Sequence, residues 1–232
     1  MIEPGCVRLA ASEIQGIVPL DVFLNGTRNY VQGSQILART AELVRPFFGQ
    51  LNLTEFAFKR TSINLIGVWL TDDSAADEPQ RIAPTIGDAL FQLDQKSIRA
   101  KFVELPAAAP KADLPETVTL KLKSGGTGGN GCFAFCGALS FEDALRTIVQ
   151  AVKKLHEALA RDARDIWLTG MRAAAIPIDK GFCDADGEIA VELVRLMRSP
   201  PQYQSLSKVT ITGLTPFFVT FALRSDRGVD VD

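Results

Sequence analysis

The sequence is poor in the residues that most metal and acid–base sites use. It has one histidine, two tryptophans and two tyrosines in 232 residues. One histidine excludes most histidine-based metal sites and every mechanism that needs two imidazoles. Twenty-five basic residues against 27 acidic ones leave a formal charge of −2, so no large field attracts polyanions. Basic and aromatic residues are not interleaved as in single-strand binding surfaces, and we expect no nucleic-acid partner.

Long apolar runs are lacking as well. The longest uncharged stretch near the C-terminus, residues 209–223, has 15 residues and includes four threonines and a proline. A membrane-spanning helix needs about 20 apolar residues, so we expect no membrane partner. Glu3 and Pro4 stand where a secretory signal has its basic and apolar regions. We therefore expect a cytoplasmic protein.

The four cysteines, at positions 6, 132, 136 and 183, are too scattered for a zinc site, which needs two close pairs. If residues 132–136 form a strand, the outer two lie about 13 Å apart, beyond the ~7 Å that a disulfide tolerates. We expect buried, reduced thiols and no metal site. No motif indicates a cofactor, and the sequence assigns no catalytic residue.

The composition itself is that of a globular protein, because 47 % of the residues are hydrophobic and 22 % are charged. Apolar residues at three- and four-residue spacing predict two main helices, at 33–48 and 140–161. Ser140, followed by Glu142 and Asp143, is typical of a helix N-terminus. Further helices are predicted at 85–93 and 187–198. Strands are predicted at 7–10, 17–24, 51–60, 62–71, 96–105, 117–123, 132–139, 166–178, 208–213 and 217–224.

This order of elements predicts an α+β fold, with mostly antiparallel sheet or sheets and two main helices packed on them. The proline- and alanine-rich stretch 106–115 is the predicted connector between an N-terminal α+β half (1–105) and a C-terminal α+β half (116–232). The two halves could also form one compact domain. An apolar helix wrapped by antiparallel strands, present twice, resembles the general shape of double hot-dog proteins, which handle acyl thioesters. That resemblance concerns the fold and implies little about activity.

A polar cluster at 25–35, just before the first main helix, is the first candidate ligand site. The N–H groups of a helix N-terminus suit an anionic or amide-bearing ligand. The candidate ligand-binding residues of this cluster are Asn25, Arg28, Tyr30 and Gln32. Turn formation and helix capping are the alternative roles for the same residues.

A glycine-rich run at 126–131 is the second candidate site and fits the pattern G-x-G-x-x-G. A dinucleotide-binding loop opens directly into a helix, but the helix predicted here begins nine residues after Gly131. We therefore predict a mobile hairpin or lid. Gly126 and Gly128 remain candidates for anion binding through their backbone N–H groups.

His156 lies at the edge of the apolar stripe of the helix predicted at 140–161. We expect a boundary histidine that is hydrogen-bonded to a neighbour. No motif ties a serine or cysteine nucleophile to it, so a general base is the less favoured interpretation.

Two functional hypotheses remain open. The first is a non-enzymatic binding or assembly module with a protein partner or self-association, because a catalytic constellation is missing. The alternative is an enzyme or binder for an acyl-thioester or phosphate-bearing small molecule, with its site at 25–35 or at the glycine-rich run. A pocket at the N-terminus of the first main helix would favour the alternative, and a flat apolar patch would favour the first hypothesis.

Overall fold

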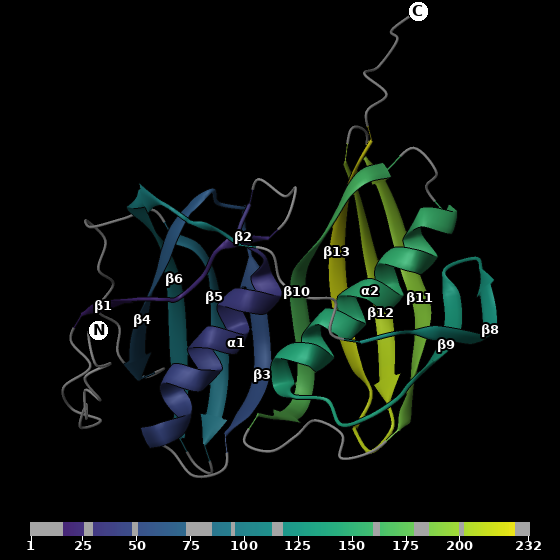
Figure 1. Cartoon of the computed structure of the whole chain (residues 1–232), viewed down its shortest axis with the longest axis horizontal. Helices are drawn as coiled ribbons and strands as arrows, with labels where there is room; N and C mark the ends of the chain where they lie inside the picture. The colour runs from purple at the N-terminus through teal and green to yellow at the C-terminus, as the bar shows by residue number, and fades with distance from the viewer. Residues whose placement is uncertain are drawn as a thin grey trace, which may run out of the picture.

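Two antiparallel half-sheets lie side by side, each with one helix across it, and both helices lie on the same side of the sheets (Figure 1). The computed structural model describes residues 16–25, 30–47, 51–72, 85–93, 96–112, 118–159, 163–178, 186–199 and 202–225. The predicted α+β fold, mostly antiparallel sheet with two main helices, is confirmed. Its twofold repetition of helix on sheet is the double hot-dog-like arrangement expected from the sequence. Neither helix is long and apolar enough to cross a membrane.

The first half contains α1 (Gly33–Val44), which continues as a short 3-10 turn, η1 (Arg45–Phe47). Its five strands pair in the order β1-β4-β6-β5-β3. They are β1 (Ile17–Pro19), β3 (Asn52–Phe58), β4 (Asn64–Asp72), β5 (Thr85–Leu93) and β6 (Lys96–Ala108). The helix forms as predicted because Ile36, Leu37 and Val44 recur on one face and are buried against the sheet.

The second half contains α2 (Phe141–Leu159) and six strands in the order β10-β13-β12-β11-β9-β8. The strands are β8 (Lys121–Thr127), β9 (Asn130–Phe135), β10 (Ala163–Pro177), β11 (Gly187–Ser199), β12 (Gln202–Ile211) and β13 (Phe217–Ser225). The predicted cap of α2 is confirmed, because the backbone N–H of Asp143 donates to Ser140 Oγ over 3.1 Å. The buried residues Leu145, Ile148, Val152 and Leu155 form its apolar stripe.

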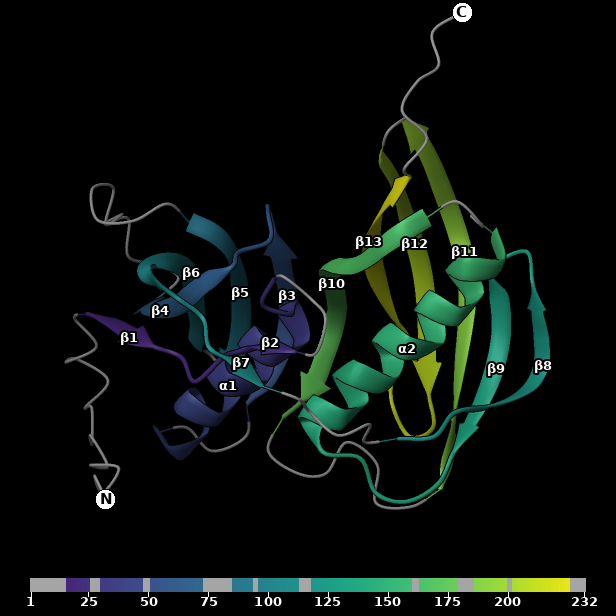
Figure 2. The same ribbon diagram turned by 45° about the horizontal axis from the view of Figure 1, so that its top comes forward.

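Strands β3 and β10 join the halves into one 11-stranded sheet, with Phe56 opposite Met171. A separate two-stranded parallel sheet pairs β2 (Leu24–Asn25) with β7 (Lys111–Ala112). The turned view places β1 and β8 at opposite ends of the molecule (Figure 2). Large buried side chains such as Phe56, Phe91 and Phe221 belong to a single core cluster that spans both halves.

The halves differ in strand order despite their shared parts. In the first half the hairpin β5–β6 lies between β3 and β4. In the second half β11, β12 and β13 follow one another as a meander, and β10 pairs with β13. The structure therefore repeats the helix-on-sheet plan without repeating the connections.

Two predicted helices are wrong. Residues 85–93 form β5, in which Ala89 and Phe91 are buried while Asp88 and Leu90 are more exposed, which is the period of a strand. Residues 187–198 belong to β11, which pairs with β12 on one side and β9 on the other. Ladder pairing on both edges decides the conformation of a segment whose apolar residues fit either period.

Smaller corrections concern register and burial. Apolar residues on both faces of β4 are typical of a central strand, yet it lies second from the edge of the sheet, between β1 and β6. Apolar residues at every second position of 118–122 would place Leu122 toward the core, yet it is 48 % exposed on the edge strand β8. The thiol of Cys132 is half-buried and that of Cys136 is exposed, so these two are not the buried thiols expected. Cys6 and Cys183 lie outside the described residues.

The division at 106–115 stays a prediction. Strand structure extends into this stretch, because β6 continues to Ala108 and β7 covers Lys111–Ala112. The strand predicted at 7–10 lies outside the described residues.

Candidate functional site

A pocket opens at the N-terminus of α1, between the two halves of the molecule. The segment leading into α1 and its first turns form one wall, and the end of β3 with the following loop forms another. Side chains of β5 and β10 complete it. The lining residues are Tyr30, Val31, Gly33, Ile36, Phe58, Arg60, Thr61, Ser62, Ile86, Trp167 and Leu168.

The backbone at the start of α1 carries no side-chain cap. Gln32 occupies the N-cap position with extended backbone angles, and its side chain makes no capping hydrogen bond. The first turn contains no acidic residue. The N–H groups of the first turn point along the helix axis at the positive end of the helix dipole. This end of α1 therefore favours an oxygen that accepts hydrogen bonds.

The N-terminus of α2 is built in the opposite way. Ser140 caps it, and Glu142 and Asp143 provide carboxylates in its first turn. Side chains of the chain itself thus supply the hydrogen-bond acceptors and negative charge that this helix end favours. Of the two helices that the structure describes, α1 is the one whose N-terminus has no side-chain cap, although the N–H of Gln35 in its first turn donates to the backbone oxygen of Gln32 over 3.1 Å.

A network of polar side chains supports the wall after β3. Ser62 Oγ donates to Glu104 Oε1 over 2.6 Å, and Asn64 Nδ2 donates to the same oxygen over 3.1 Å. Arg60 Nη2 donates to Glu104 Oε2 over 2.5 Å. The hydrogen bond from Ser62 lowers the pKa of the Glu104 carboxyl, with Arg60 adding to the effect and burial opposing it. Glu104 is therefore ionised near neutral pH and holds Arg60 and Ser62 at the pocket.

The hollow is small, with about 20 Å³ of space. That is roughly the room one water-sized group needs, so it fits a single oxygen and not a whole ligand. Gly33 packs closely here, since a Cβ on it would lie 2.5 Å from Cε2 of Phe58. The absent side chain lets β3 approach the first turn and keeps the pocket narrow.

The structure brings only part of the predicted site together. Tyr30 lines the pocket, and Gln32 is the N-cap beside it. Asn25 lies in β2, opposite Ala112 of β7. Arg28 lies outside the described residues. Sequence reasoning missed Arg60, Thr61 and Ser62, although the polar run where the predicted strands 51–60 and 62–71 meet could have indicated them.

Gly126 and Gly128 lie elsewhere, in the hairpin of β8 and β9 at the far edge of the second half (Figure 1). Thr127 pairs with Asn130, so the loop between them is a two-residue turn. Gly128 and Gly129 both have positive φ, 61° and 80°, as such a hairpin turn requires. The hairpin part of the prediction is confirmed. Turn geometry accounts for the glycines, and anion binding there remains a prediction.

His156 is more buried than expected for a boundary residue, at 1 % exposure. Its Nδ1 lies 2.7 Å from the backbone oxygen of Val152, so the predicted bond to a neighbour is confirmed. Burial lowers the pKa of the imidazole, and the hydrogen bond to Val152 opposes the shift. It does not line the pocket at α1.

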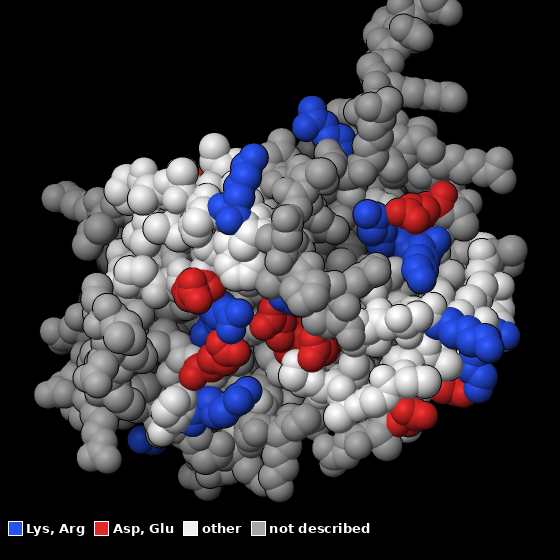
Figure 3. Space-filling model, viewed as in Figure 1, with Lys and Arg blue, Asp and Glu red and all other residues white. Residues whose placement is uncertain are grey.

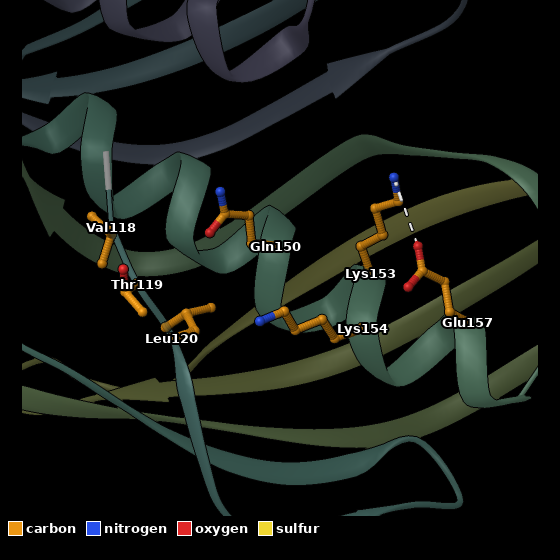
Figure 4. A pocket seen from close by; sticks show the side chains of 7 residues that line it. All are labelled: Val118, Thr119, Leu120, Gln150, Lys153, Lys154 and Glu157. Atoms are coloured by element: carbon orange, nitrogen blue, oxygen red, sulfur yellow. Dashed lines mark ion pairs between the residues drawn. The ribbon is translucent and has the colours of Figure 1, made fainter. Parts of the chain in front are cut away.

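Two larger hollows lie on the surface. A groove of about 470 Å³ runs between the 118–120 segment and the outer side of α2 (Figure 4). Lys154 reaches across it toward Leu120, while Lys153 pairs with Glu157 over 3.7 Å. These side chains are largely solvated, which makes a weak ligand site.

The other groove, also about 470 Å³, crosses β3, β10, β13 and β12 on the face of the sheet that the helices leave uncovered. Leu206 and the 42 % exposed Phe218 contribute its apolar surface, and Arg172 pairs with Glu55 at 2.9 Å on its rim. This is the kind of apolar surface that favours the assembly hypothesis.

Charged side chains show no single-signed patch on the helix-bearing face. Acidic and basic groups alternate in small clusters among the residues described (Figure 3). Within the same part of the chain, no three potential metal ligands of the histidine, cysteine, aspartate or glutamate type come together.

Comparisons with known proteins give a likeness of fold only. No protein-family model matches the sequence, and a comparison with curated proteins finds no match. A conserved protein of unknown function with a hot dog fold from Alicyclobacillus acidocaldarius is 11 % identical, with 92 % of this chain and 93 % of that chain covered and a TM-score of 0.47. The acyl-CoA thioesterase II TesB2 from Mycobacterium marinum is 12 % identical, with 95 % and 99 % covered and a TM-score of 0.43. At these values no activity follows, and the function has to be argued from the residues of this chain.

Proposed function

We propose that this protein binds a phosphate-bearing acyl thioester at the N-terminus of α1. The acyl carbonyl oxygen occupies the small hollow and accepts hydrogen bonds from N–H groups of the first helical turn. The observation that supports the proposal is the uncapped, acid-free end of α1 beside a hollow with room for one oxygen.

The carbonyl of a thioester suits this place for two reasons. Its oxygen is about the size of the space available, and it carries a partial negative charge that the helix N-terminus stabilises. The side chains of Phe58, Trp167 and Ile86 supply apolar walls for the carbon atoms next to the carbonyl. Polarisation of the carbonyl follows from the same contact.

Arg60 is the proposed anchor for a phosphate group. Its side chain is 45 % exposed at the pocket, and one of its nitrogens, Nη2, bonds to Glu104. A guanidinium has five N–H donors in a planar fork, so this pairing leaves donors for phosphate oxygens. Thr61, the next residue in the chain, is exposed and also lines the pocket.

The proposal is limited to binding. The described lining contains no carboxylate, imidazole or thiol that could act as a general base or a reactive nucleophile. Ser62 also lines the pocket, but its buried hydroxyl group donates a hydrogen bond to Glu104.

Calorimetric titration with acetyl-coenzyme A and with coenzyme A tests the proposal. We expect the acetyl thioester to bind about fivefold more tightly, the worth of roughly one hydrogen bond. Gln32→Asp should remove that difference because its carboxylate takes the N–H groups, whereas Arg60→Gln should weaken both ligands. Ser140→Ala, the matched change at α2, should alter neither. Equal affinity of the two ligands for the unmodified protein would refute a carbonyl site.

The apolar groove on the uncovered sheet face favours a second candidate function, assembly. Phe218 is the exposed aromatic residue there. If two copies associate through this face, analytical ultracentrifugation of the unmodified protein should show an apparent mass that rises with concentration. The Phe218→Lys variant should show the mass of one chain. A concentration-independent single-chain mass in the unmodified protein would exclude self-association.

A further inference from the structure

Three polar side-chain atoms lie buried beneath α2 without a hydrogen-bond partner among the residues that the structure describes. They are Nε2 of His156, Oγ of Ser205 and Oγ of Ser207. The three residues are 1 %, 1 % and 0 % exposed. Buried polar atoms nearly always have a partner, in the protein or in ordered water, so three orphans in one region indicate a site.

Strand pairing places the serines under the histidine. The His156 ring stacks on Phe221, with ring centroids 5.9 Å apart and planes 28° from parallel. Phe221 of β13 is directly opposite Ser205 of β12, and paired residues share a face of the sheet. Ser207 is two residues further along the same strand, so it faces α2 as well.

The hydrogen bond of His156 to its own helix fixes what Nε2 can do. Nδ1 lies 2.7 Å from the backbone oxygen of Val152, and a carbonyl oxygen can only accept. In the neutral ring Nδ1 therefore carries the hydrogen, and Nε2 presents a lone pair. Burial lowers the pKa of this imidazole, which keeps the ring neutral at pH 7. Nε2 thus needs a hydrogen-bond donor.

The neighbours of the two serines cannot provide what these groups need. Across the ladders, Ser205 stands between Phe221 and Leu196, and Ser207 between Val219 and Leu193. All four neighbouring side chains are apolar. The hydroxyls must therefore find their partners in the space between β12 and α2.

We propose that His156, Ser205 and Ser207 form an internal binding site for one water molecule, separate from the site at α1. The water donates to Nε2 of His156 and bonds to both serine hydroxyls, which matches the roughly three hydrogen bonds that a buried water makes. Two residues apart on a strand, the serines stand about 6.6 Å from each other. A water with near-tetrahedral hydrogen bonds of ~2.8 Å to both hydroxyls spans about 4.5 Å, so the side chains need to lean together by about 2 Å. The site ties the last turns of α2 to the middle of β12.

Nitrogen-15 NMR of the full-length protein tests the site directly, because the chain has one histidine and its ring signals need no assignment. We expect a neutral ring protonated at Nδ1, an Nε2 shift typical of a hydrogen-bonded acceptor, and a nuclear Overhauser peak between water and the carbon-bound Hε1 of the ring. Protonation at Nε2, or absence of the water peak, would overturn the proposal.

Serine-to-alanine variants provide a second measurement that does not depend on the spectrum. If Oγ of Ser205 is an orphan, Ser205→Ala should raise the urea midpoint, and if Oγ holds the water the midpoint should fall. We expect Ser205→Ala alone to lower the urea midpoint. In a protein that also carries His156→Leu, where the water has lost a partner, Ser205→Ala should lower the midpoint by less. Ser124→Ala, at an exposed serine of β8, is the matched control and should change neither midpoint. An increase in the midpoint, or equal falls in both backgrounds, would contradict the site.

Discussion

Two adjacent residues of α2 test which face of the helix is packed into the core. Ile148 is fully buried, whereas Val149 is half-buried at the margin of the core cluster. Ile148→Ala removes three carbon atoms, worth about 2.4 kcal/mol at ~0.8 kcal/mol per buried group. The cavity left behind raises the expected loss to about 3–4 kcal/mol. Val149→Ala removes two carbons that are partly solvated already, so we expect about 1 kcal/mol.

Urea unfolding followed by tryptophan fluorescence is the appropriate assay. Trp69 lies on β4 in the first half and Trp167 on β10 in the second, so the signal reports on both. In thermal melts followed by the same fluorescence, a loss of 1 kcal/mol lowers Tm by about 2–4 °C for a chain of this size, so Ile148→Ala should lower Tm by at least about 6 °C. The m-value should stay constant if the denatured state is unchanged.

The outcome that would refute this reasoning is a larger loss for Val149→Ala than for Ile148→Ala. It would mean that α2 is rotated about its axis relative to the sheet. Lys154→Ala on the solvent side of the same helix is the control, and its effect should stay within about 0.5 kcal/mol. A loss comparable to that of Ile148→Ala at this position would show that the assay does not distinguish the faces.

Three further effects follow from named contacts. Stability should fall as the pH drops below about 6.5, because burial lowers the pKa of His156 and the unfolded chain then takes up the proton first; urea melts at pH 7.5 and 5.5 should show a smaller fall in His156→Leu. Gly33→Ala should lower Tm, although alanine is the better helix former, because its Cβ would lie 2.5 Å from the Phe58 ring. Glu142→Gln should cost about 0.5–1 kcal/mol in urea melts, because the carboxylate lies 3.7 Å from Arg39 of α1, and it should cost less in an Arg39→Gln background, where Glu142 keeps its pair with Arg146 but not the one with Arg39.

The two main helices could be predicted because their apolar residues fit the helical period and no other. In α2 the stripe of Leu145, Ile148, Val152 and Leu155 leaves no alternation by two. In β11, by contrast, Ile189 and Leu193 fit a helix, while Ile189 and Val191 fit a strand. Its five paired positions with β9 join segments far apart in the sequence, and a local pattern does not contain such contacts.

The candidate site divides in the same way. Tyr30 and Gln32 could be predicted because they lie next to the start of a helix that the sequence shows clearly. Arg60 and Trp167 reach the same pocket from the far end of β3 and from the other half of the chain. The pairing of β3 with β10 brings them there, and that register depends on both sheets being complete.

Substitutions at the N-termini of α1 and α2 should have opposite effects on stability and on ligand binding. An aspartate at an N-cap satisfies a first-turn N–H and adds a charge that the helix dipole favours, so Gln32→Asp should stabilise the protein by about 0.5–2 kcal/mol. Ser140→Ala removes such a cap and should cost about 1 kcal/mol. If the end of α1 serves a ligand, the stabilised variant is the one that loses the preference for acetyl-coenzyme A over coenzyme A, while the destabilised variant keeps it. Urea melts and titrations on the same two proteins check both signs. A Gln32→Asp variant that is no more stable would show that the first-turn N–H groups of α1 already have partners, which would refute the binding site together with the cap argument.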